Sequence, residues 1–163
     1  MSHEPFLAFR DDLQRIAECV APVEVILVPD DLPDRPAAII RCEHPGPMIG
    51  TLPPGGATVD FRMRLVGLPP ASNPEDDADG FAIVEQSVIV RDAERRDLLV
   101  WQFGPNDGTL QIAARLVTSL APSIAHIRFP TGYVPLEAIV RALIEQFGIT
   151  PRVDDWETRL ASQ

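Results

Sequence analysis

The spacing of apolar residues changes along the chain, and each change marks a predicted element. Residues 5–20 place apolar side chains at intervals of three and four, which predicts an amphipathic helix with Cys19 in the core. The runs at 23–28 and 37–43 are short and apolar, and both predict strands. Residues 58–66 alternate apolar and polar side chains, which is typical of a half-buried antiparallel strand.

The second half of the chain begins with strands and then returns to helical spacing. Residues 81–90 and 97–104 predict a hairpin with a longer loop. Residues 109–121 and 134–148 have the spacing of helices, and the short run at 124–129 between them predicts a strand. If that strand lies parallel to the second strand of the hairpin, the helix between them is a right-handed crossover.

Strands that are grouped ahead of helices indicate an α+β fold. We predict a mainly antiparallel five- to six-stranded sheet, with an N-terminal helix and two C-terminal helices packed on one face. The chain of 163 residues is long enough for a single domain, 1–163, with its own core. Residues 67–80 combine prolines, small residues and acids and predict a mobile acidic loop, while 151–163 predict a polar C-terminal tail.

The composition is typical of a soluble globular protein. Hydrophobic residues make up 45% of the chain and charged residues 23%. No apolar run approaches the about 20 residues that a membrane helix needs. The N-terminus lacks the pattern of a secretory signal, so we expect a cytoplasmic protein that does not bind membranes. Two cysteines are too few for a disulfide scaffold.

The charge of the chain is strongly negative and unevenly distributed. All 14 basic residues are arginine, which is typical of a GC-rich, bacterial-like coding source, and the formal net charge is −10. Residues 1–80 hold 14 acidic residues against 6 arginines. Direct binding to nucleic acid calls for a basic patch, so this charge argues against it and favours a protein partner with a basic or mixed-charge surface. Acids cluster in the predicted connections at Asp30, Asp31, Asp34 and 75–79.

The stretch RCEHPGPMIGTLPPGG at 41–56 contains the densest group of chemically capable residues. Cys42 and His44 are two positions apart on a predicted strand, on one face but too far apart for a direct hydrogen bond. Zinc needs further ligands, which the chain does not offer at CxxC or HxxxH spacing, and a phosphate loop needs a lysine ahead of a helix. We therefore interpret this stretch as a strand end and a turn, with Cys42 in the core and no metal or cofactor.

The acidic loop contains EDDADG at 75–80, which has the alternating acids and the glycine of a calcium loop. The bidentate acid of such a loop should fall at Gln86, whereas Glu85 is one position early. We therefore predict a solvated acidic loop instead of a calcium site.

Two loops are candidates for a ligand site. GPNDGT at 104–109 and PTGY at 130–133 each follow a predicted strand and precede a predicted helix. Backbone amides at a helix start can bind anions, and ligands bind at this edge of open α/β sheets. The competing interpretation is that both are ordinary capped helix starts. The candidate residues are Asn106, Asp107, Gly108, Thr109, Thr131, Gly132 and Tyr133.

Arginines are predicted to share one polar face of the sheet. If 37–43 pairs with 58–66, this face holds Arg41, Arg62 and Arg64. Such a stripe either binds carboxylates of a partner or forms a solvated face together with neighbouring acids.

One protein family has a similar order of turns. A helix and two strands precede GPMIGTLPPGGATVDFRMRLVGLPP at 46–70, which resembles ubiquitin-conjugating enzymes and RWD domains with their GP turn, GG turn and proline-rich stretch in a four-stranded meander. The chain departs from that family where its chemistry lies, because no HPN tripeptide and no downstream cysteine follow. The resemblance therefore implies a catalytically inactive domain of this kind.

Two main functional classes remain open. The first is a noncatalytic protein-interaction module, such as an adaptor, an inhibitor or an immunity-type partner, that uses an acidic surface. Its candidate contacts are Asp30, Asp31, Asp34 and Trp156, an aromatic residue in a polar tail. The second is a small-molecule enzyme or ligand-binding domain that uses the two candidate loops. The lack of an assembled nucleophile, base and metal favours the first class.

Overall fold

The computed structural model describes residues 4–30, 32–51, 56–68, 80–106, 109–110, 113–116, 127–129 and 133–161. Its helices are α1 (Glu4–Ala17), α2 (Leu136–Glu145) and α3 (Trp156–Ala161). Its strands are β1 (Val25–Pro29), β2 (Ala37–Cys42), β3 (Pro47–Met48), β4 (Ala57–Gly67), β5 (Phe81–Asp92), β6 (Asp97–Phe103), β7 (Pro105–Asn106), β8 (Thr109–Leu110), β9 (Ala113–Leu116) and β10 (Ile127–Phe129).

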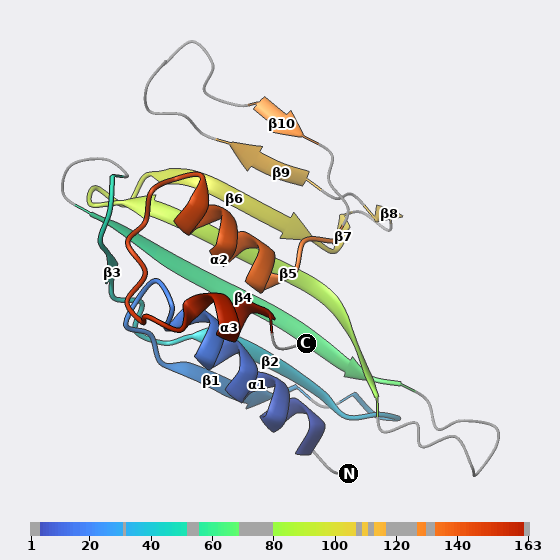
Figure 1. Cartoon of the computed structure of the whole chain (residues 1–163). Coiled ribbons are helices and arrows are strands. Elements are labelled where there is room, and N and C mark those ends of the chain that lie inside the picture. Colours follow the sequence, from blue (N-terminus) through green and yellow to red (C-terminus); the bar gives the residue numbers. More distant parts are fainter. Residues whose placement is uncertain are drawn as a thin grey trace.

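The strands form one large antiparallel sheet in the order β1-β2-β4-β5-β6-β9-β10, with the short β3 paired to β4. β7 and β8 form a separate two-stranded hairpin. The helices α1, α2 and α3 lie over the same face of the large sheet (Figure 1). The predicted α+β fold, with a mainly antiparallel sheet and an N-terminal and two C-terminal helices, is therefore confirmed.

The helix predicted for residues 109–121 is wrong. The described residues of this segment form β8 and β9, and β9 lies between β6 and β10, antiparallel to both. The strand predicted for 124–129 is present at its end as β10, but β6 and β10 are separated by β9 instead of forming a parallel pair. The backbone of β9 pairs with the edge of β6, and this nonlocal pairing outweighs a local preference for helix.

The second C-terminal helix is α3, which lies in the segment predicted to be a polar tail. Leu160 is buried and Trp156 is half-buried against the core. These residues are four positions apart and so lie on one side of the helix, which gives α3 a narrow apolar stripe. α3 has 6 residues, which is too few for the helical spacing of its apolar residues to be recognised in the sequence. None of the described helices is both long and apolar enough to cross a membrane.

The core lies between the sheet and the helices. The predicted alternation of β4 is present, with buried Val59, Phe61, Met63 and Leu65. The buried residues of the two longer helices are Phe6, Leu13, Ile16 and Ala17 in α1 and Leu136, Ile139, Val140 and Leu143 in α2. Cys19 and Cys42 both belong to this cluster, as their positions predicted.

β2 ends at Cys42, and Pro47 and Met48 then pair antiparallel with the start of β4, in agreement with the interpretation of 41–56 as a strand end and a turn, while residues 52–55 lie outside the described residues. The Thr51 backbone N–H donates to the Gly148 carbonyl at 3.0 Å, and the Thr150 N–H donates to the Ile49 carbonyl at 2.7 Å. Gly148 has a φ of 69°, a left-handed conformation that glycine adopts without a steric penalty. This turn therefore connects the sheet to the residues that follow α2.

β1 is an edge strand whose open side is partly closed by α1. The Gln14 Nε2 donates to the Val23 carbonyl at 2.8 Å, and the Gln14 Oε1 accepts from the Val25 N–H at 2.7 Å. The side-chain amide thus makes the two hydrogen bonds that a neighbouring strand would make. At the other end of β1, Pro29 has no N–H to donate. Both features blunt an edge that would otherwise be open to pairing with another chain.

Candidate partner-binding surface

The face of the sheet opposite the helices carries charged side chains. No described helix or strand covers it (Figure 1), and we call it the open face. Side chains of a strand alternate between faces, so the pattern that buries the core residues of β4 directs Asp60 and Arg62 outward. The charged groups here are accessible: the exposed fractions of the Arg41, Glu43 and Asp60 side chains are 48%, 37% and 40%.

The strand register arranges the side chains of the open face in two neighbouring rows. The basic row contains residues paired across β1, β2, β4 and β5, namely Ile26, Arg41, Arg62 and Ser87. The acidic row lies two residues further along and contains Glu24, Glu43, Asp60 and Ile89. Glu24 and Glu43 are joined by a backbone hydrogen bond just beyond β1 and β2, Asp60 pairs with Ile89, and continuation of the β2–β4 register sets Glu43 beside Asp60. Because the side-chain period of a strand is two, both rows lie on the same face.

Most charges on the open face are paired within the chain. The pairs are Arg64 with Asp30 at 2.9 Å, Arg91 with Asp60 at 3.2 Å and with Asp97 at 3.1 Å, and Arg41 with Glu43 at 3.1 Å. Arg62 is exposed and forms no ion pair with any other described residue. It lies directly opposite Arg41, and like charges in register repel each other. This position therefore favours the approach of a further carboxylate.

The predicted contacts Asp30, Asp31 and Asp34 belong to the connection between β1 and β2. Asp30 pairs with Arg64 and keeps 39% of its side chain exposed. Asp34 is exposed, and the described residues offer it no ion pair. Asp31 lies outside the described residues, as do residues 75–79 of the EDDADG stretch.

Trp156 is the first residue of α3 and is not part of an extended tail. Its ring packs against the core, and the guanidinium carbon of Arg141 lies 5.8 Å from the ring centroid. A cation over an aromatic face is attracted to the ring, which helps to orient it. Trp156 is half-buried, so part of its surface remains available to a partner.

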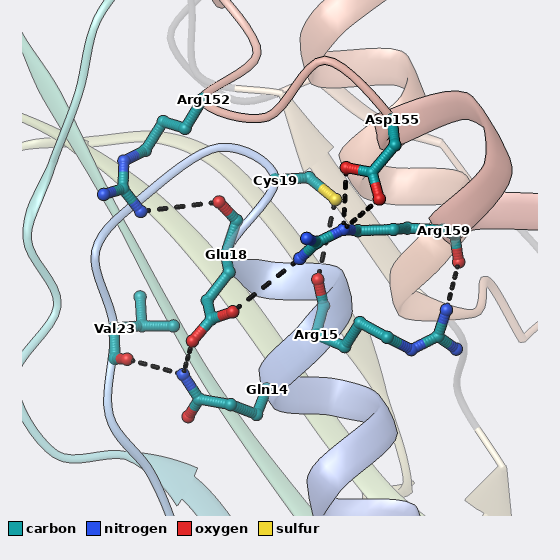
Figure 2. Close-up of polar contacts among 8 residues, drawn as sticks. All are labelled: Gln14, Arg15, Glu18, Cys19, Val23, Arg152, Asp155 and Arg159. Carbon is teal, nitrogen blue, oxygen red and sulfur yellow. Dashed lines mark hydrogen bonds and ion pairs between the residues drawn. The ribbon is translucent and has the colours of Figure 1, made fainter.

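Arginines hold α3 and the residues before it against the end of α1 (Figure 2). Arg159 Nε donates to both carboxylate oxygens of Asp155, at 3.0 and 3.1 Å, and Arg15 Nη1 donates to the Arg159 carbonyl at 3.1 Å. The Arg152 backbone N–H donates to the Cys19 carbonyl at 2.8 Å. Cys19 is enclosed by these contacts, and burial raises the pKa of its thiol.

The structure does not gather the predicted contacts into one patch. α3 packs at the C-terminal end of α1, from which the chain leads into the start of β1. Asp30 and Asp34 follow the far end of β1. The acidic connection and Trp156 therefore lie on two separate surfaces.

The loop at 104–109 forms the β7–β8 hairpin, in which Asn106 pairs with Thr109. The helix start predicted at Thr109 is therefore wrong, and the anion-binding amides expected there do not follow from this geometry. Asparagine, aspartate and glycine are the residues that tight hairpin turns favour, which explains this outcome. Of the other candidates, Asp107, Gly108, Thr131 and Gly132 lie outside the described residues.

The ends of the two candidate loops nevertheless lie side by side. The rings of Phe103 and Tyr133 meet edge to face with centroids 5.4 Å apart, and the Gln86 Nε2 donates to the Val134 carbonyl at 2.7 Å. Gln86 is buried, and its Oε1 has no hydrogen-bond partner in the described part of the chain. Burial raises the pKa of Tyr133 to about 12, so its hydroxyl stays protonated near neutral pH.

The geometry around Cys42 and His44 gives no support to nucleophilic or metal chemistry. Cys42 is buried, and desolvation raises the pKa of its thiol to about 12, whereas the thiolate is the nucleophilic form. His44 is exposed on the following turn. Among the residues that the structure describes, no three His, Cys, Asp or Glu side chains are grouped to bind a metal ion.

Comparison with models of protein families, with characterised proteins and with solved structures finds no match to this chain. The resemblance to ubiquitin-conjugating enzymes and RWD domains therefore stays a prediction from sequence. The function has to be inferred from the surfaces of this chain itself.

Sequence reasoning found the arginine stripe of Arg41, Arg62 and Arg64 but missed Glu24 and Arg91. The alternation of side chains along each strand places Glu24 and Arg91 on the same face of the sheet as the stripe. Only the pairing of β1 with β2 and of β4 with β5 places them beside it. Each of these pairings joins two separate segments of the chain, so the residue pattern within one segment does not predict it.

Proposed function

We propose that this protein is a noncatalytic protein-interaction module that binds a partner with a basic or mixed-charge surface. The observation that carries this proposal is the accessibility of the acids between β1 and β2. Asp34 is exposed without an ion pair to another described residue, and Asp30 keeps 39% of its side chain exposed. The net charge of −10 adds to the negative potential at this end of the sheet.

Exposed charges of one sign act mainly on the encounter between two proteins. They raise the association rate with an oppositely charged surface, and salt weakens them because the screening length is about 8 Å at physiological ionic strength. The energy of the bound state comes chiefly from buried anchors, and Trp156 is the aromatic candidate. A partner that contacts both Asp34 and Trp156 has to extend along the length of α1.

The state of the thiols supports a noncatalytic role. Burial raises the pKa of the Cys42 thiol to about 12, so the thiol is protonated near neutral pH. Cys19 is completely buried and its pKa is also raised by desolvation. Neither thiol has the exposed, low-pKa environment of a reactive cysteine.

A small-molecule site is the second candidate, and the contact between Phe103 and Tyr133 favours it. This contact brings the two loop ends together next to the buried Gln86 Oε1, an acceptor without a described partner. Native mass spectrometry of the purified protein tests this alternative. A bound metabolite that is lost in Tyr133→Ala would favour it over the protein-interaction module.

The acidic contact is tested by the association kinetics of the partner. The partner is first co-purified with the native protein and identified. Its association rate constant is then measured against ionic strength for the wild type, Asp34→Arg and Glu94→Arg. Glu94 is a matched control, because its side chain is 71% exposed in the turn between β5 and β6.

We expect the association rate to fall with added salt and in Asp34→Arg, and to stay close to that of the wild type in Glu94→Arg. A rate that is indifferent to both salt and Asp34→Arg would contradict the acidic contact. An unchanged dissociation constant in Trp156→Ala would remove the aromatic anchor from the proposal.

A further inference from the structure

We infer that the open face of the sheet binds a second copy of this chain. The inference concerns the two charged rows of the sheet, which include neither Asp34 nor Trp156, so it goes beyond the proposed function. It is based on the two charged rows, on their order across the sheet, and on the position of Arg62.

Arg62 carries a charge on the open face that no described residue balances. It is exposed, it stands opposite Arg41, and no other described residue forms an ion pair with it. Arg41 is already paired with Glu43 at 3.1 Å. A carboxylate that approaches Arg62 from outside would balance its charge and relieve the repulsion between the two guanidinium groups.

The acidic row supplies such a carboxylate in Asp60. Arg91 Nη1 contacts the Oδ2 of Asp60 at 3.2 Å, and 40% of the Asp60 side chain is exposed. A carboxylate accepts several hydrogen bonds, so the Oδ1 of Asp60 remains able to accept from a second guanidinium group. Within one chain, Asp60 and Arg62 are two positions apart on β4, and both side chains point away from the core.

A two-fold axis brings the rows of two copies into register. The axis runs parallel to the rows, between them, and midway between two open faces that pack against each other. Rotation about it places Asp60 of one copy opposite Arg62 of the other, and Glu43 opposite Arg41. It does so twice, because a two-fold interface repeats every contact. At the β2 and β4 positions of the rows, a second copy therefore carries the complementary charge, and at the β1 position the axis sets Glu24 opposite Ile26.

The two uncharged residues at the β5 end of the rows fit the same arrangement. The axis sets Ile89 of the acidic row opposite Ser87 of the basic row of the other copy. Both residues are half-buried in the single chain, so their remaining surface can be covered. The stems of the arginines add apolar surface to such a contact while their charged ends pair.

The open face is large enough for a specific interface. The rows cross β1, β2, β4 and β5, which have 5, 6, 11 and 12 residues, whereas Val100 on this side of β6 is buried. With a rise of about 3.4 Å per residue and about 4.8 Å between strands, these four strands present roughly 550 Å² per copy. Two copies together bury roughly 1,100 Å², above the roughly 1,000 Å² that separates specific interfaces from incidental ones. Two facing sheets also pack with their strands nearly aligned, as the rows require.

The test exchanges charges between two variants of the full chain. Arg62→Asp puts acids in both rows on β4, and Asp60→Arg puts arginines in both. Each variant alone faces like charges across the axis and should be monomeric by sedimentation velocity, whereas the wild type should have twice the mass of the 17.9 kDa chain. An equimolar mixture of the two variants should recover the dimer, because every facing pair is then of opposite sign.

Arg95→Asp is the matched control, since Arg95 is exposed in the turn between β5 and β6 and has a φ of 63°, which aspartate tolerates. It should stay dimeric. Circular dichroism verifies the fold of each variant. If a reversal variant is unfolded, Arg62→Gln replaces it and should weaken self-association by about tenfold or more.

A wild type that is monomeric at submillimolar concentration would overturn the inference. A dimer that survives both reversals, or Arg62→Gln, would overturn it as well, because another surface would then hold the copies together. Failure of two folded reversal variants to form a mixed dimer would exclude the proposed axis. None of these outcomes affects the kinetic test with Asp34→Arg, so the two proposals fail independently.

Discussion

At the scale of single residues, the Gln14 amide takes the place of a missing strand beside β1. It accepts from the buried Val25 N–H and donates to the Val23 carbonyl. An apolar side chain of similar size would leave both backbone groups without these partners. A buried, unpaired N–H or carbonyl group destabilises a fold by more than a typical hydrogen bond contributes.

We therefore expect Gln14→Leu to lower the free energy of unfolding by about 1–3 kcal/mol. Urea denaturation measures this change. Gln146→Leu is the control, because Gln146 is exposed at the end of α2, and its effect should stay within about 0.5 kcal/mol. Equal stability of Gln14→Leu and the wild type would show that the edge of β1 does not depend on this amide.

Cys42 is a second residue whose role follows from its surroundings. We expect Cys42→Ala to lower the free energy of unfolding by about 1–2 kcal/mol, as a small truncation in the core, and to leave partner binding intact. Iodoacetamide near pH 8 should label neither cysteine of the folded protein, because both thiols are buried and have raised pKa values. The unfolded protein, which should be labelled at both cysteines, is the control. Rapid labelling of Cys42 in the folded protein would contradict this assignment.

At the scale of elements, α3 depends on few apolar contacts and many polar ones. Leu160 is its buried side chain, and Trp156 covers the neighbouring surface. The arginines shown in Figure 2 fix its direction, but they are partly exposed, so water and salt weaken their contribution. The apolar stripe should therefore dominate the stability of this element.

Leu160→Ala should lower the free energy of unfolding by about 2–3 kcal/mol and speed up hydrogen exchange at residues 152–160. Glu157→Ala, on the exposed side of α3, should change stability by no more than about 0.5 kcal/mol. If Leu160→Ala is as stable as Glu157→Ala, the polar contacts hold α3 by themselves.

At the scale of the whole molecule, the absence of lysine shapes the response to alkaline pH. The arginine guanidinium keeps its proton to above about pH 12. In a chain without lysine, the side chains that lose a proton above about pH 9 are therefore the two thiols and the single tyrosine. Burial raises the pKa of Cys42 from 9.0 to about 12 and also raises that of Cys19. Desolvation raises the pKa of Tyr133 from 10.0 to about 12.

These shifts predict a loss of stability in alkali. A thiol whose pKa is higher in the folded state stabilises the protein fully below pH 9.0, and this contribution is lost as the pH rises towards about 12. Across that range, the Cys42 thiol lowers the free energy of unfolding by about 1.4 kcal/mol per pH unit. Cys42→Ala should show a shallower decline than the wild type in urea denaturation at a series of pH values. Identical slopes would mean that Cys42 is not the titrating group.

Local periodicity by itself determined much of this architecture. The three-to-four spacing of residues 5–20, the alternation in 58–66 and the turn residues at 41–56 predicted α1, β4 and the hairpin between β3 and β4. These features depend on the burial of one side of a single segment, which the order of apolar and polar residues records directly. The burial of Cys42 follows from the same alternation.

Only the tertiary structure decided the features that depend on a second segment. The residues at 113–116 have a helical pattern, yet they form β9 because β6 offers an edge whose backbone groups need partners. α3 forms because α1 and the core present a surface to Leu160. The acidic and basic rows exist because the register sets Arg41 beside Arg62 across β2 and β4. Strand register and edge pairing depend on two segments together, so the spacing of apolar residues within one segment does not predict them.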